Sequence, residues 1–153
     1  MLELTPVTKL ALPHDAFVFI GDGRKALFLR NEGDEKYANL VTERVLADAE
    51  NPASHDQGTD RPGRVSSGSA RSAVETTDWH DIEEHRFAKT AAAALERIVR
   101  DRAAPALVIA APARTLADLR KALHDDVKAR VIAEIDKDFT KIPVWEIEKH
   151  IVG

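Results

Sequence analysis

Residues 106–111 form an unbroken apolar run, Ala-Leu-Val-Ile-Ala-Ala, and Pro112 follows it directly. A strand with apolar side chains on both faces must be covered on both faces, which is typical of the central strands of parallel sheets flanked by helices. Proline ends such a strand because it has no amide hydrogen to give to the sheet. This segment therefore favours an α/β fold whose sheet is covered by helices on each side.

The first third of the chain predicts a three-stranded antiparallel meander. Residues 16–20 are apolar and are followed by Gly21-Asp22-Gly23, after which residues 26–29 are again apolar. An Asp-Gly pair suits a tight hairpin turn because glycine adopts positive φ without steric conflict. A polar turn at residues 31–34 then leads to a third strand, which is expected over residues 37–46.

Helical periodicity predicts a long helix over residues 79–102. Asp78 is expected to cap it, with Asp81 as an acidic partner in the cap, and Glu96 and Arg100 are expected to pair on its wet face. The apolar residues that fall on one stripe, and are expected to point inward, are Ile82, Ala88, Ala91, Ala92, Leu95, Ile98 and Val99.

The last third of the chain predicts helix, strand and helix. A helix is expected to begin at Thr115 with Asp118 in its cap, and its inward residues are expected to be Leu116, Leu119, Leu123 and Val127. Residues 131–135 alternate in polarity, as in a strand at the edge of a sheet. A final helix is expected near Pro143, because proline is tolerated in the first turn.

The order of elements is therefore β-β-β-α-β-α-β-α. A meander followed by two right-handed crossovers gives an α/β fold with a five-stranded mixed sheet, expected in the order 3-2-1-4-5, and helices on both faces. This layout resembles the ribonuclease H-like fold, which the middle domain of archaeal and eukaryotic peptide-chain release factors shares. The length of 153 residues fits one domain over residues 1–153.

Composition excludes several classes of protein. The chain has no cysteine, which excludes disulfide scaffolds, thiol catalysis and iron–sulfur clusters. Its 22 basic and 26 acidic side chains give a net charge of -4, so it cannot coat nucleic acid by bulk charge. It shows no signal peptide and no apolar stretch near the ~20 residues of a membrane helix. We therefore expect a cytoplasmic protein with no membrane partner.

Catalytic patterns are weak. A two-metal nuclease would need carboxylates at the centre of the sheet, and the candidates are Asp22 with Glu83 or Glu84, but the apolar run 106–111 brings no acid. His80 and His85 lie about 140° apart on a helix and cannot share one metal ion. No nucleophilic serine elbow, phosphate-binding loop or dinucleotide fingerprint is present. The sequence predicts no catalytic residue, no metal site and no cofactor, and it leans away from an enzyme.

A long loop is expected at about residues 50–77, which are rich in Gly, Pro and Ser. After Asp60 no acidic residue occurs until Glu75, so Arg61, Arg64 and Arg71 form a local positive patch. Arginine holds phosphate oxygens in pairs, and glycine and serine let the backbone approach them. The candidate RNA- or anion-binding residues are Asp60, Arg61, Gly63, Arg64, Ser66, Ser67, Ser69 and Arg71. A plain connector whose arginines pair with Asp48, Glu50 or Asp56 is the other interpretation.

Several short motifs together resemble the bacterial host attachment protein family over nearly the whole chain. They are the stretches 58–64 and 68–71, Trp79-His80, Glu84, the stretch 86–88, the stretch 133–138 and Thr140-Lys141. The resemblance implies a role in attachment to host cells and a relation to the release-factor middle domain. Release factors carry a Gly-Gly-Gln loop, whereas this chain has only Gln57-Gly58, so peptidyl-tRNA hydrolysis is not carried over.

The preferred hypothesis is a cytoplasmic, release-factor-like protein that binds RNA or the ribosome through its Arg/Ser/Gly loop. The alternative is a non-catalytic scaffold that binds other cytoplasmic proteins and affects host attachment indirectly. A metal-dependent nuclease ranks last. DNA is not predicted as a partner.

Overall fold

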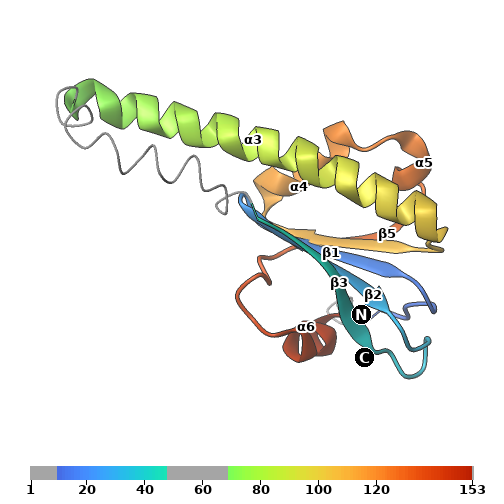
Figure 1. Ribbon diagram of the computed structural model, residues 1–153. Coiled ribbons are helices and arrows are strands. Elements are labelled where there is room, and N and C mark those ends of the chain that lie inside the picture. Colours follow the sequence, from blue (N-terminus) through green and yellow to red (C-terminus); the bar gives the residue numbers. More distant parts are fainter. Residues whose placement is uncertain (1–9, 48–68, 153) are drawn as a thin grey trace, which may run out of the picture.

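The computed structural model describes residues 10–47 and 69–152, with the side chains of residues 10–47 and 79–152 (Figure 1). Its centre is a five-stranded sheet in the order β3-β2-β1-β4-β5. The strands β1, β2 and β3 pair antiparallel, whereas β4 is parallel to β1 and β5 is parallel to β4. The strand bounds are Phe17–Gly21 for β1, Lys25–Asn31 for β2, Leu40–Ala47 for β3, Leu107–Ala111 for β4 and Val131–Asp136 for β5. The predicted strand order is confirmed.

Helices cover both faces of the sheet (Figure 1). Helices α3, α4 and α5 lie on one face and α6 lies on the other. Their bounds are Ser69–Arg102 for α3, Ala113–Ala122 for α4, Asp125–Lys128 for α5 and Val144–Ile151 for α6. The predicted α/β class is therefore confirmed, while the ribonuclease H-like relation stays a prediction.

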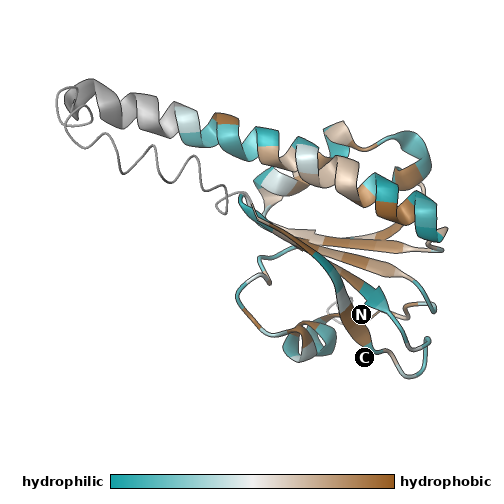
Figure 2. Ribbon diagram, viewed as in Figure 1, coloured by the Kyte–Doolittle hydropathy of each residue, from teal (hydrophilic) through white to brown (hydrophobic). Residues whose placement is uncertain are grey.

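The two central strands explain why two layers of helices are needed. Every residue of β1 and of β4 is buried, as the apolar run at residues 106–111 predicts. Alternate side chains of β1 enter two separate cores: Phe17 and Phe19 pack under α3 and α4, whereas Val18 and Ile20 pack against α6. Figure 2 shows this as hydrophobic colour on the strands between the helices.

Helix α3 begins at Ser69, ten residues before its expected start at Trp79. Asp78, expected as the cap, therefore lies inside the helix, and the loop expected to run to residue 77 cannot extend past residue 68. The physical reason is that Gly68 is the last glycine before the helix, and residues 69–102 contain neither glycine nor proline. At its other end, Ala104 N donates to Val99 O and Ala103 N to Arg100 O, a Schellman motif.

The later elements differ from prediction in their ends. Helix α4 begins at Ala113 after Pro112, and no side chain caps it, so the expected cap of Thr115 and Asp118 is wrong. The helix expected to continue to Val127 stops at Ala122 and resumes as the short α5. Strand β3 begins at Leu40 rather than residue 37. In residues 10–47 and 69–152, no helix combines the length and apolar character that crossing a bilayer requires.

Candidate functional site

Most of the predicted RNA-binding residues lie outside the described part of the chain. Those residues are Asp60, Arg61, Gly63, Arg64, Ser66 and Ser67. The other two, Ser69 and Arg71, were expected in a loop but lie in the first turn of α3, because nothing after Gly68 interrupts a helix. Their backbone is therefore that of a helix and not of a loop.

The amino-terminal part of α3 extends beyond the sheet (Figure 1). No side chain from Trp79 to Arg86 is buried, and Phe87 is the first residue of the helix to enter the core among its described side chains. At 1.5 Å per residue, Arg71 lies about 24 Å along the helix axis from Phe87. Helix α3 therefore carries Arg71 away from the body of the protein.

Asp22 directly follows β1 and contacts the segment that follows β5. The backbone N–H groups of Arg24 and Lys25 both donate to Asp22 Oδ1 at 2.7 Å, which confirms the tight turn. The expected positive φ of its glycine is wrong, because no glycine among the described residues has positive φ and the Asp22 side chain holds the turn instead. The Thr140 hydroxyl, itself buried, lies 3.2 Å from Asp22 Oδ2 and 2.5 Å from Asp138 Oδ1. Asp22 thus holds the turn in place and joins it to the segment after β5.

Glu84 approaches the same turn from α3. A Cβ atom at Gly23 would lie 2.7 Å from Glu84 Cδ, so glycine permits this approach. Arg114 Nη1 lies 3.9 Å from Glu84 Oε1, and Arg114 Nη2 donates to Asp81 at 2.6 Å. The hydrogen bond to Asp81 raises the pKa of Arg114. Within residues 10–47 and 69–152, no three His, Asp or Glu side chains are grouped so that they could hold a metal ion.

The two histidines of this part of α3 have different neighbours, as their helical spacing predicts. His80 Nδ1 lies 3.4 Å from Arg24 Nη2, whereas His85 Nδ1 lies 2.7 Å from Asp118 Oδ2. Asp118, expected as a helix cap, instead links α4 to α3. The two imidazoles therefore join α3 to two different elements.

The outward face of α3 carries a row of exposed side chains that we call the α3 outer stripe. It consists of Trp79, Ile82, Arg86, Lys89 and Arg97, at intervals of three, four, three and eight residues. Trp79 is 54% exposed and Ile82 48%. Ile82 was expected to point inward, and that prediction is wrong because Ile82 lies on the side of the helix away from the core residues Phe87 and Leu95.

Two hollows flank the stripe and share His85 and Lys89. The first, between α3 and α4, has a volume of about 290 Å³ and is lined by His85, Lys89, Asp118, Lys121 and Ala122. The second has a volume of about 270 Å³ and is lined by Ile82, His85, Arg86 and Lys89. The sequence analysis did not identify this surface, although a tryptophan and three basic residues at helical spacing, on the side away from the alanines, were a visible signal.

Glu96 and Arg100 occupy the carboxyl-terminal half of α3. Glu96, expected on the wet face, is only 7% exposed, because its carboxylate receives the backbone N–H of His124 at 2.6 Å and lies 2.7 Å from His124 Nδ1. Arg100 approaches Glu96 within 3.8 Å but makes its hydrogen bonds to Asp126, at 2.8 and 2.9 Å. These hydrogen bonds lower the pKa of Asp126 to about 2.

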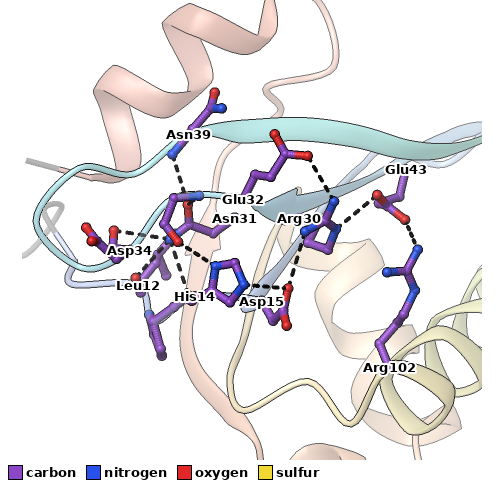
Figure 3. Close-up of polar contacts among 12 residues, drawn as sticks. Leu12, His14, Asp15, Arg30, Asn31, Glu32, Asp34, Asn39, Glu43 and Arg102 are labelled. Atoms are coloured by element: carbon purple, nitrogen blue, oxygen red, sulfur yellow. Dashed lines mark hydrogen bonds and ion pairs between the residues drawn. The ribbon is translucent and has the colours of Figure 1, made fainter.

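A second polar cluster joins the other end of β2 to its surroundings (Figure 3). We call it the Asn31–Arg30 network. Asn31 is fully buried; its amide donates to Leu12 O at 2.9 Å and Pro13 O at 3.2 Å and accepts from the N–H groups of Gly33 and Asn39, both at 2.9 Å. Its carbonyl and amide are both satisfied, which is what a buried amide requires.

Arg30 forms the second half of this network. It contacts Asp15, Glu32 and Glu43, and Glu43 also receives a hydrogen bond from Arg102 at the end of α3 (Figure 3). The hydrogen bond to Glu43 is the largest cause that raises the pKa of Arg30. All these groups are occupied by one another, so the network holds strands and α3 together and leaves little for a ligand.

A comparison with family models finds one match, described as "Protein required for attachment to host cells", over residues 17–151. The match covers all five strands and all four described helices. The residues that lead into β1 lie outside it. No curated protein matches the sequence.

Proposed function

This chain belongs to the host attachment protein family, and from that premise we propose that it is a cytoplasmic RNA- or ribosome-binding protein. The contact with RNA is made by the Arg/Ser/Gly segment of residues 58–71. The observation that carries the proposal is the run of Arg61, Arg64 and Arg71 without an acidic residue, in a chain of net charge -4. A local positive charge attracts a polyanion to that place, whereas the rest of an acidic protein repels it.

The position of α3 supports this proposal. Arg71 lies near the start of a helix whose first part stands clear of the sheet (Figure 1). A ligand there would meet the end of α3 before it met the acidic residues of the body. A segment carried on a projecting helix suits a partner as large as a ribosome better than a small molecule, which needs a closed pocket.

The proposed likeness to release factors concerns the arrangement of strands and helices only. It does not extend to their catalytic activity. No Gly-Gly-Gln tripeptide occurs in the sequence. The function we propose is therefore binding without peptidyl-tRNA hydrolysis, and an effect on host attachment would follow from altered translation or RNA fate.

RNA binding and ribosome co-sedimentation of purified protein test the proposal. The variant Arg61/Arg64/Arg71→Ala is compared with wild type and with a matched control, Lys36/Arg44/Lys128→Ala, which removes three exposed cations outside the segment. We expect the first variant to lose co-sedimentation and to reduce the salt slope on single-stranded RNA by about 2. Equal binding by all three proteins contradicts the proposal.

The scaffold function predicts a different outcome in the same cells. Affinity capture of the tagged protein, with and without nuclease, separates the two functions. Partners that survive nuclease treatment and bind the arginine variant equally well would favour a protein scaffold. Recovery of ribosomal components that depends on the three arginines would favour RNA binding.

A further inference from the structure

The α3 outer stripe is a surface of the described chain that the proposed function leaves unexplained. Its residues lie opposite the buried face of α3, whose core residues are Phe87, Ala88, Ala91, Ala92, Leu95 and Val99. Nothing in the packing of the fold requires a tryptophan or an isoleucine on that outward face. The exposure of both side chains therefore calls for a reason outside the fold.

The cations of this surface differ from the other cations on the same helices. Arg100, Arg114 and Arg120 each make a hydrogen-bonded ion pair with a carboxylate. Lys89, Arg97 and Lys121, in contrast, have no ion-pair partner among the residues that the structure describes. Arg86 has only Glu83, at 3.7 Å. Two of these unpaired cations, Lys89 and Lys121, line the hollow between α3 and α4.

The hollow contains one carboxylate, Asp118, which contacts His85 at 2.7 Å. Lys89 and Lys121 face the same hollow from α3 and α4. Two ammonium groups and an imidazole therefore surround a single carboxylate that already has a partner. An anion in this space would meet more positive than negative charge.

A tryptophan at one end of the stripe and three basic side chains along the rest favour a nucleic acid over a protein as the occupant. The centre of a protein interface is depleted in charged residues, whereas three of the five stripe residues are charged. Proteins that bind single strands combine positive charge along the backbone path with aromatic rings on which bases stack. Trp79 offers such a ring, and Lys89 and Lys121 at the hollow offer the positive charge.

We propose that the α3 outer stripe, with Lys121, is a second binding surface for single-stranded RNA. Trp79 stacks on a base, Lys89 and Lys121 hold a phosphate at the hollow, and Arg97 holds a phosphate further along the strand. The proposal deepens the proposed function and rests on it for the class of ligand. It uses different residues, however: Trp79 lies about 12 Å along the helix from Arg71, so one strand would pass from the segment onto the stripe.

The test is binding of a fluorescein-labelled, mixed-sequence single-stranded RNA to the full chain. The variant Lys89/Arg97/Lys121→Ala is expected to bind at least about tenfold more weakly at low salt, with a salt slope reduced by about 2. The control Lys36/Arg44/Lys128→Ala, which removes the same charge, is expected to bind as wild type. Because all of these side chains are exposed, each variant should fold, and far-UV circular dichroism checks this.

Trp79 provides an independent measurement. In a Trp145→Phe background the remaining tryptophan reports directly on stacking, and RNA is expected to quench its fluorescence. Trp79→Ala is expected to weaken binding about tenfold, while Trp79→Phe retains part of the affinity. Unchanged fluorescence together with unchanged affinity of Trp79→Ala overturns the stacking role.

The outcomes separate this inference from the proposed function. If the stripe variant binds as wild type while Arg61/Arg64/Arg71→Ala does not, the stripe is wrong and the proposed function stands. If only the stripe variant loses RNA, the stripe stands and the segment is wrong. If wild type binds no RNA, both fail. Loss of a nuclease-resistant protein partner by the stripe variant, with RNA binding unchanged, assigns the stripe to a protein and overturns the inference.

Discussion

The Asn31–Arg30 network and the α3 outer stripe are both rich in polar groups, but they use them in opposite ways. In the network each charge and each amide contacts a partner within the chain (Figure 3). On the stripe, Lys89 and Arg97 have no ion-pair partner within the described residues, and a tryptophan is half exposed. Polar groups that satisfy one another stabilise the fold, whereas those left facing solvent are available to a ligand.

The strained backbone positions lie beside the Asn31–Arg30 network and not on the α3 outer stripe. The two residues other than glycine with positive φ, among those described, are Asp15 at 71° and Ala103 at 51°. Asp15 accepts from Arg30, and Ala103 follows Arg102 at the end of α3. The network therefore lies where the chain is held in unusual conformations, and it supplies the contacts that keep them there.

The largest effect that would test this contrast is expected from Asn31→Ala. The substitution leaves the buried carbonyl of Leu12 and the partly buried N–H groups of Gly33 and Asn39 without their side-chain partner, so we expect the free energy of unfolding to fall by about 3 kcal/mol. Urea denaturation measures it. The control is Asn39→Ala, which removes an exposed side chain but keeps the N–H group. If both variants were equally stable, the network would not be the stabilising element that we infer.

Gly33→Ala is expected to have the next largest effect. A Cβ atom there would lie 2.0 Å from the carbonyl oxygen of Tyr37 and 3.0 Å from Asn39 N, so the backbone of the turn must move. We expect a loss of about 2 kcal/mol in thermal or urea unfolding. Gly23→Ala is the matched control near the other end of the sheet. Its near atoms belong to the flexible Glu84 side chain, and a similar loss there would contradict the comparison.

Ala103→Gly is expected to stabilise the protein. Ala103 occupies the left-handed position of the Schellman motif, which glycine adopts without the steric penalty of a Cβ atom. The free energy of unfolding should rise by about 1 kcal/mol. Ala104→Gly, next to it, serves as the control and should not stabilise. A loss of stability in Ala103→Gly would mean that the end of α3 is held differently.

The Arg100–Asp126 pair is expected to make a smaller contribution, which appears as a pH dependence of the free energy of unfolding. Arg100 lowers the pKa of Asp126 from 3.8 to about 2, so the pair stabilises the fold above the ordinary pKa and this contribution is lost as the pH falls toward about 2. Both side chains are largely exposed, and the effect should be small and reduced by salt. Asp126→Asn should flatten the pH dependence of unfolding in that range, while Asp125→Asn should leave the contribution of the pair in place.

The smallest effect on stability is expected from the stripe. Lys89→Ala, Arg97→Ala and Lys121→Ala should each change the free energy of unfolding by less than about 0.5 kcal/mol, because no described partner is lost and alanine favours the helix. Urea denaturation of the three single variants checks this. A loss as large as that of Asn31→Ala would show that the stripe serves the fold and would remove the distinction between the two regions.

Part of this molecule could be predicted because the information is local. The period of apolar residues identifies the five strands and the helices α3, α4 and α6, and the short connections with their fixed handedness then leave the order 3-2-1-4-5. The Asp22 turn was equally predictable, since a short carboxylate before glycine accepts hydrogen bonds from the backbone that follows it. These predictions do not depend on which segments far apart in the sequence come into contact.

What the tertiary structure alone decided is which side chains are covered. Ile82 was predicted inside and Glu96 outside, and both placements are reversed: Ile82 lies on the side of α3 away from its core residues, and His124 arrives from a distant segment to cover Glu96. The partners of Asn31 and the hollow between α3 and α4 likewise come from segments far apart in the chain. Burial depends on which elements meet, whereas a helical or strand repeat says only which side chains share a face.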